Sequence, residues 1–145
     1  MFIEGTDHDE GVVVWIFAGE TNDDADYRAY CESITRFERM TSERKRVAVL
    51  VVDPSSPMPN ARWRREIADR SRNIRPNTIF VLVGNAVARG VATAINWIRP
   101  PTYEMRTAAS FLDALALAEA STGRPLPRLR ELHDEARERI RARGA

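Results

Sequence analysis

Three side chains with reactive groups gather where one apolar run of the chain ends. Asp53 closes the run over residues 47–53, and Ser55 and Ser56 come two and three positions later. Ligands of α/β proteins bind at the carboxyl ends of strands, so a carboxylate and two hydroxyls at this position suit an enzyme. No general base stands near them in the sequence. Catalysis through these residues is therefore one hypothesis, to be weighed against a simple turn.

A second candidate site follows the apolar run over residues 78–83. Asn85 is placed to cap the next helix, whose amino end has a modest preference for anions. Arg89, in the first turn of that helix, opposes the helix dipole, so a compensating partner is expected. A salt bridge from Arg89 to Asp53 or Glu66 is favoured over a ligand clamp. Asp53, Asn85 and Arg89 are thus candidates for a ligand or partner surface.

The remaining reactive side chains form no recognisable centre. The two histidines, His8 and His133, have no cysteine or second histidine at metal-ligand spacing. The acidic turn over 7–10 lacks the spacing of a calcium loop, which favours solvated acids. Cys31 lies on the apolar face of a predicted helix and is interpreted as a buried structural thiol. Without a nucleotide-binding or hydrolase motif, we expect no catalytic residues, no metal and no cofactor.

Length and composition are those of an ordinary globular chain. Hydrophobic residues make up 43% and charged residues 30% of the 145 positions, which suits one domain with a short appendage. The longest apolar run, over 47–52, is much shorter than the roughly 20 residues that span a bilayer. The first residues lack the basic segment of a signal peptide, and the single cysteine cannot form an internal disulfide. We expect a soluble cytoplasmic protein without a membrane span.

The net charge of +1 hides an asymmetry along the chain. Residues 1–32 sum to −8, residues 33–122 to +6 and residues 123–145 to +3. Opposite charges in separate segments favour self-association or a complementary protein partner through electrostatic steering. The segment 62–75 holds six arginines and two acids but no interleaved exposed aromatic residues. That pattern favours a solvated face over a nucleic-acid or membrane surface.

Apolar runs and turn residues predict five strands. A hairpin is expected first, and then the uniformly apolar run over 47–53, which is typical of a central strand buried on both faces. A third buried strand and a short edge strand follow. The predicted strands are 2–5, 12–17, 47–53, 78–83 and 103–107.

Apolar residues at steps of three and four predict the helices between these strands. Gly90, inside the third helix, is explained by close packing of that helix on the sheet. The predicted inner faces are Tyr27, Tyr30, Cys31, Ile34, Phe37 and Met40; Trp63, Ile67, Ser71 and Ile74; Val87, Val91, Ala94, Ile95 and Ile98; and Phe111, Leu112, Leu115 and Ala118.

A break over 123–127 separates a last, highly charged helix from the rest. Its apolar stripe is Leu129, Leu132, Ala136 and Ile140, and Glu135 and Arg139 are spaced for an ion pair. This helix packs on the domain, on a partner or on nothing; the sequence leaves the three alternatives open. The predicted domains are 1–122 and a helical extension over 123–145.

The element order is therefore β-β-α-β-α-β-α-β-α plus a C-terminal helix. Strands that alternate with helices imply right-handed crossovers and a mostly parallel sheet covered by helices. The leading hairpin adds one antiparallel strand. The fold class is α/β with a mixed sheet.

Three stretches resemble the STAS superfamily, and most closely its SpoIIAA-like branch, which includes small bacterial domains described as STAS/SEC14-like. The first is the run 47–53 leading into Pro54-Ser55-Ser56, and the second is Trp63-Arg64-Arg65-Glu66-Ile67. In the third, over 79–97, a strand leads through a small-residue turn and an Arg-Gly pair into a helix that ends in tryptophan. The resemblance covers about residues 1–120.

The resemblance implies a switch or docking module rather than an enzyme. Anti-sigma-factor antagonists of that superfamily carry a phosphorylatable serine in an Asp-Ser-Ser-Gly-like turn after the central strand. The matching segment here, Asp53-Pro54-Ser55-Ser56-Pro57, has two serines but lacks that order. Ser55 and Ser56 are therefore phospho-switch candidates in competition with a turn whose hydroxyls cap the nearby backbone.

The function expected from these observations is a non-enzymatic regulatory or scaffolding module that binds another protein or itself. The alternative is a carrier or sensor of a small apolar or lipid ligand. That alternative requires a pocket between the sheet and the helices over 27–40 and 63–74. Nucleic acid is not expected as a partner.

Overall fold

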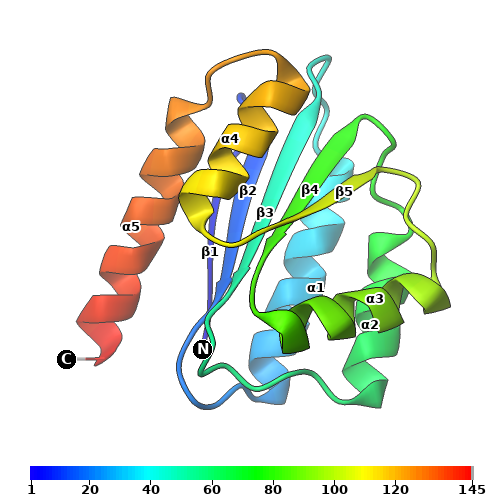
Figure 1. The fold of residues 1–145 in the computed structure, drawn as a ribbon, viewed down its shortest axis with the longest axis vertical. Coiled ribbons are helices and arrows are strands. Elements are labelled where there is room, and N and C mark those ends of the chain that lie inside the picture. The colour runs from blue at the N-terminus through cyan, green and yellow to red at the C-terminus, as the bar shows by residue number, and fades with distance from the viewer. Residues whose placement is uncertain (145) are drawn as a thin grey trace.

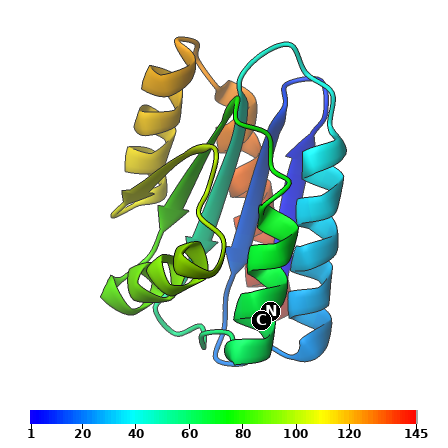
Figure 2. The same cartoon turned by 90° about the vertical axis from the view of Figure 1, so that its right-hand side faces the viewer.

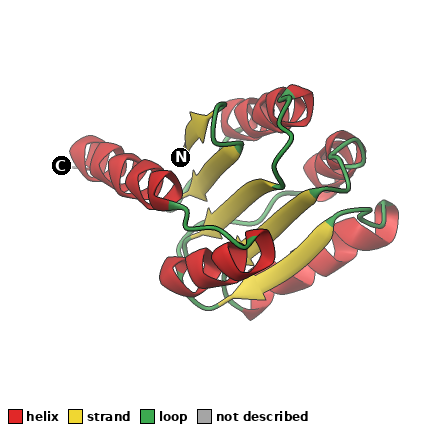
Figure 3. Cartoon of the chain, turned by 90° about the horizontal axis from the view of Figure 1, so that it is seen from above, coloured by secondary structure: helices red, strands yellow, loops and turns green. Residues whose placement is uncertain are grey.

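The computed structural model describes residues 1–144 as three layers, with a five-stranded sheet between two groups of helices (Figure 1, Figure 3). The strands lie side by side in chain order, and β1 is antiparallel to β2 whereas all other neighbours are parallel. The predicted mixed, mostly parallel sheet is confirmed. The strands are β1 (Phe2–Asp7), β2 (Val12–Phe17), β3 (Arg46–Val52), β4 (Thr78–Val83) and β5 (Glu104–Ala108).

Three helices cover one face of the sheet and two cover the other (Figure 2). The first three each connect one parallel strand to the next, and right-handed crossovers place all of them on the same side. They are α1 (Asp24–Arg39), α2 (Ala61–Ser71) and α3 (Ala86–Ile98). The opposite face carries α4 (Phe111–Thr122) and α5 (Pro127–Gly144).

The strands β2 and β4, which flank the central strand β3, are buried along their whole length. Because side chains alternate along a strand, one set enters the core beneath α1 and α2, and the other enters the core beneath α4 and α5. Trp15 shows the first case and Ile16 the second. This arrangement explains why both runs are apolar at every position.

The helices begin where capping residues stand in the sequence. Asp23 forms a reciprocal capping box with Asp26 at the start of α1, and Asn60, Asn85 and Ser110 accept backbone N–H groups at the starts of the next three helices. Gly123 ends α4 in the left-handed conformation, with φ of 68°. The predicted cap at Asn85 and the predicted break after residue 122 are confirmed.

Arg46 is a buried cation that the sequence did not predict. Its side chain is 1% exposed, and its Nη1 donates to the carbonyl oxygens of Phe37, Glu38 and Met40 at 3.1, 3.3 and 2.7 Å. These carbonyls lie at the end of α1, where the helix leaves acceptors unpaired and carries partial negative charge. Burial lowers the pKa of the guanidinium. Arg46 therefore caps the carboxyl end of α1 from the first position of β3.

The charged C-terminal helix packs on the domain. Leu129, Leu132 and Ala136 of α5 are buried in the same hydrophobic cluster as α4 and the sheet, and Ile140 packs against that cluster. Figure 1 shows α5 running alongside the β1 and β2 side of the sheet. The sequence left open whether this helix packs on the domain, on a partner or on nothing. It packs on the domain, where α5 supplies part of the core.

The acidic start of the chain is neutralised largely within the molecule. Arg124 lies 3.1 Å from Glu10, Arg128 lies 3.0 Å from Asp7, and Arg36 of α1 lies 2.6 Å from Glu4. Part of the charge asymmetry is thus used in contacts inside one chain.

One ion pair predicted within α5 is not formed. Glu135 contacts Arg128 at 3.3 Å, whereas Arg139 donates to the backbone oxygen of Glu4. The predicted Glu135–Arg139 pair is wrong because Arg139 is turned toward β1. None of the helices within residues 1–144 is long and apolar enough to cross a membrane.

Candidate functional site

Asp53 forms an ion pair with an arginine of the last helix. Its two carboxylate oxygens accept hydrogen bonds from Arg137 Nη1 and Nη2, each at 2.8 Å. This two-point contact fixes the geometry of both side chains and joins the end of β3 to α5. The carboxylate that the enzyme hypothesis requires is therefore held in a structural pair.

The two serines of the following loop differ in accessibility. Ser56 is 5% exposed, and its Oγ accepts a hydrogen bond from Asn22 Nδ2 at 2.6 Å. The backbone N–H of Ser56 closes a turn by donating to the backbone carbonyl oxygen of Asp53 at 2.9 Å. Ser55 is exposed. Of the two phospho-switch candidates, only Ser55 stands open to a modifying enzyme.

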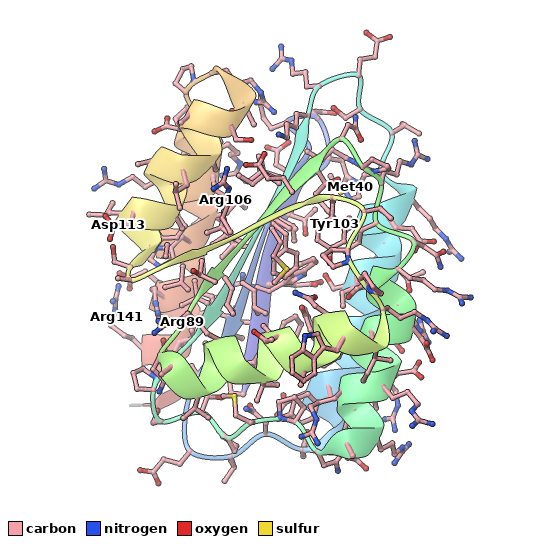
Figure 4. The ribbon with its side chains drawn as sticks, turned by 45° about the vertical axis from the view of Figure 1, so that its right-hand side comes forward. Met40, Arg89, Tyr103, Arg106, Asp113 and Arg141 are labelled. Atoms are coloured by element: carbon pink, nitrogen blue, oxygen red, sulfur yellow. The ribbon has the colours of Figure 1, made fainter. Side chains whose placement is uncertain are left out.

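Asn85 and Arg89 serve the start of α3. Asn85 Oδ1 accepts the N–H of Ala88 at 3.0 Å, and Arg89 Nη1 donates to the Gly84 oxygen at 3.0 Å. The salt bridge predicted from Arg89 to Asp53 or Glu66 is wrong, because Asp53 pairs with Arg137, and Glu66 pairs with an arginine of its own helix. Figure 4 shows Arg89 beside the start of α3.

The three residues proposed as one surface are therefore not assembled into a site. Asp53 and Asn85 follow neighbouring parallel strands, as predicted. Within residues 1–144, however, no side-chain hydrogen bond or ion pair links Asp53, Asn85 and Arg89 to one another, and the one bond between any two of them is the helical backbone contact from Arg89 N–H to the Asn85 oxygen at 3.0 Å. Asn85 and Arg89 bond to backbone groups near them in the chain, whereas Asp53 pairs with the distant Arg137.

The other reactive residues have structural environments. Burial raises the pKa of the Cys31 thiol to about 11, which keeps it protonated and poorly nucleophilic. The His133 ring stacks on Phe111 with ring centroids 3.8 Å apart, and burial lowers its pKa. Among the described residues, no group of three or more histidines, cysteines and carboxylates is placed to hold a metal ion.

The arginines of α2 are mostly solvated or paired at the surface. Arg70 contacts Glu66 at 3.0 Å, and Asp69 contacts Arg99 at 3.4 Å. These are the only two acids between residues 60 and 99, a segment that holds eight arginines. The layer formed by α2 and α3 is thus strongly cationic.

Helix α3 exposes apolar side chains to solvent. Trp97 is 82% exposed and Val87 is 62% exposed, although an inner position was predicted for Val87 and for Ile98. Only Ala88 of this helix is fully buried, so the predicted face is rotated from the observed one. We call the exposed, uncharged set the α3 outer face; it consists of Ala86, Val87, Gly90, Thr93, Trp97 and Ile98.

The orientation of α3 explains this exposure. Figures 1 and 2 show α3 lying across the strand direction, whereas α1 and α2 run alongside the strands. A helix placed across the sheet covers less of it. Leu50 and Val52, which face α3 from the central strand β3, accordingly remain only partly buried.

Gly90 lies on the α3 outer face, and an added Cβ atom would meet nothing within 4 Å. Close packing on the sheet is therefore the wrong explanation for this glycine. We expect Gly90→Ala to raise the free energy of unfolding by about 0.5–1 kcal/mol, because alanine has the higher helix propensity. Urea unfolding followed by circular dichroism measures the change. A decrease in stability would contradict the open surroundings described for Gly90.

An apolar cavity lies beneath α3. Its volume is about 80 Å³, it is partly open to solvent, and it is lined by the sheet, α1, α2, α3 and the loop that contains Pro57. Leu50 and Leu82 form part of its floor, and Ala92 and Ile95 form part of its roof. The sequence-based alternative required a pocket between the sheet and the first two helices; the cavity extends instead under the third.

Sequence reasoning missed both the α3 outer face and the cavity. A signal was present, since α3 carries only one charged residue, Arg89, over its 13 positions. A helix that is apolar all around is normally buried. That composition, rather than its periodicity, marks α3 as unusual for a helix on the outside of a domain.

Comparison with known proteins identifies no relative. No family model matches the chain, and no curated protein or solved structure matches it. The class of protein that the fold defines is an α/β protein with a mixed five-stranded sheet. The STAS resemblance rests on the quoted sequence stretches and remains a proposal.

Proposed function

We propose that this chain is a non-catalytic regulatory or scaffolding module that binds another protein through the α3 outer face. The observation that carries the proposal is the 82% exposure of Trp97 on a helix with a single charged residue, Arg89, over its 13 positions. Tryptophan is among the residues that contribute most to protein interfaces. Exposed apolar clusters with a polar rim are typical of partner-binding sites.

The surroundings of the α3 outer face support an acidic partner. The segment 60–99, which includes α2 and α3, carries eight arginines against two acids, and both acids are already paired with arginines. Two copies of this chain meeting through α3 would bring like charges together. A different protein with an acidic rim around an apolar anchor would meet complementary charge.

The state of the polar residues supports binding over catalysis. Asp53 is held by Arg137, Ser56 is buried by its contact with Asn22, and the Cys31 thiol has a raised pKa. A docking role is also what the STAS resemblance implies. A cytoplasmic setting belongs to the same proposal.

A pull-down with matched variants tests this proposal. Wild-type protein, Trp97→Glu and Leu112→Glu are used as baits in nuclease-treated cell extract. Leu112 is 58% exposed on α4, across the sheet from α3, so it controls for the loss of any exposed apolar side chain. We expect one protein to be enriched by wild type and Leu112→Glu, and to be reduced at least tenfold with Trp97→Glu.

The purified pair then has to form a complex whose affinity falls as salt rises, because the arginines of the segment 60–99 contribute to association. Enrichment that is equal for all three baits overturns the proposal. A dimer of this chain in light scattering that Trp97→Glu dissociates also overturns it, since the surface would then bind a second copy.

A further inference from the structure

The cavity beneath α3 exists because small side chains face the sheet from this helix. Ala88 and Ala92 project toward the sheet side, where the other crossover helices place large residues such as Phe37 and Trp63. The helix also crosses the strands at a steep angle (Figure 1). Space therefore remains over Leu50 and Leu82, and it is not filled by any side chain among the described residues.

The wall of the cavity is mostly apolar, although Ser71 and Asn96 also line it, and side chains that carry charge are absent from its lining. Apolar cavities take up small apolar molecules, as an engineered cavity of about 150 Å³ takes up benzene. At about 80 Å³, the present cavity is roughly half that size. A ligand that enters without moving α3 is therefore smaller than benzene.

The chain's three tyrosines all line this cavity, and their hydroxyl groups differ in hydrogen bonding. The Tyr27 hydroxyl donates to the Pro57 oxygen at 3.3 Å. The hydroxyls of Tyr30 and Tyr103 have no hydrogen-bond partner within residues 1–144, and Tyr30 is only 2% exposed. Figure 4 shows Tyr103 at the approach to β5, on the side covered by α1 and α2. Two hydroxyl groups at the cavity therefore remain free to donate a hydrogen bond to a ligand.

The protonation state of these tyrosines also restricts the charge that a ligand can carry. Burial raises the pKa of Tyr103 to about 12 and that of Tyr30 well above its usual value of 10. Both hydroxyls thus remain neutral donors at ordinary pH. A charged ligand would lose its hydration without gaining an opposite charge, which disfavours its binding.

We infer that the cavity beneath α3 binds a small, uncharged, apolar molecule that carries one hydrogen-bond acceptor, such as a short-chain carbonyl compound. The apolar part lies between Leu50 and Ile95, and the acceptor receives a hydrogen bond from Tyr30 or Tyr103. This site is on the opposite side of α3 from the proposed docking face, and it does not depend on the docking proposal.

Two probes separate the apolar part of the site from its polar part. Xenon reports an accessible apolar cavity, and 2-butanone adds a carbonyl acceptor. Titration of the full chain is followed by the NMR shifts of the Ala92 and Ile95 methyl groups. We expect saturable shifts with both probes.

Variants assign the binding to named residues. In Ala92→Phe, the added ring fills the cavity and both probes lose saturable binding; Thr93→Phe, on the outer face, keeps both. The double variant Tyr30→Phe/Tyr103→Phe preserves side-chain volume and weakens 2-butanone about five- to tenfold, while xenon changes by less than twofold. Tyr27→Phe leaves both affinities unchanged because its hydroxyl is already engaged.

Two results overturn the inference. Absence of saturable shifts with either probe in the folded wild type shows that the cavity takes no ligand of this class. Equal 2-butanone affinity in the wild type and the double tyrosine variant removes the role of the hydroxyls. Trp97→Glu leaves both probes bound, so failure of the docking proposal and failure of this one are distinguished.

Discussion

Replacement of Arg46 by methionine should lower the free energy of unfolding by about 2–4 kcal/mol. The guanidinium is the donor to three carbonyls at the end of α1, at distances of 2.7–3.3 Å. Methionine fills much of the same space but leaves these buried acceptors without a donor. Relief from burying a charge offsets part of the loss, which keeps the expected value below the sum of three charged hydrogen bonds.

Urea unfolding followed by tryptophan fluorescence measures this change, because Trp15 lies in the core beside α1. Arg72→Met is the matched control: Arg72 is exposed after α2, and its backbone rather than its side chain makes the cap contact. We expect the control to change stability by less than about 0.5 kcal/mol. A loss below 1 kcal/mol for Arg46→Met would show that solvent or the backbone satisfies the end of α1 without the arginine.

Features set by neighbouring residues in the chain were predictable from the sequence. Asp23, Asn60, Asn85 and Ser110 cap helices because a short side chain reaches backbone groups two or three positions away. The uniform runs of β2, β3 and β4 likewise indicate burial on both faces without reference to any distant residue. The order of these elements then determines the parallel crossovers.

Features set by distant residues were not predictable. Arg137 contacts Asp53 across 84 positions, and nothing in the local sequence of either residue indicates the other. Arg46 stands before an apolar run, a position that usually marks a loop, and its role follows only from where α1 ends. For the same reason, the partner expected for Arg89 was sought among the wrong acids.

The orientation of α3 shows a second limit of periodicity. Its sequence is rich in alanine and valine on all sides, so steps of three and four do not select one face. The structure places Ala88 inward and Val87 outward. Both the α3 outer face and the cavity depend on which side of α3 faces the sheet. The candidate site was therefore not predictable from the sequence, although the fold was.

Replacement of Leu129 by alanine should lower the free energy of unfolding by about 2–5 kcal/mol. Leu129 is fully buried between α5 and the sheet, in a cluster with Leu126 and Leu132. The substitution removes apolar contacts and leaves a cavity that surrounding side chains fill only in part. Chemical unfolding measured in parallel for Leu112→Ala, the same change at an exposed position of α4, should show less than about 0.5 kcal/mol.

The same series decides what holds α5 on the domain. Arg128 contacts Asp7, Glu131 and Glu135, but its side chain is 35% exposed, and exposed ion pairs contribute about 0–1 kcal/mol. Arg128→Gln should therefore cost much less than Leu129→Ala. If the two losses were equal, or if Leu129→Ala behaved like Leu112→Ala, α5 would be held by its charges rather than by burial. In that case the helix would detach as salt rises, and the sheet face beneath it would itself become an exposed apolar surface.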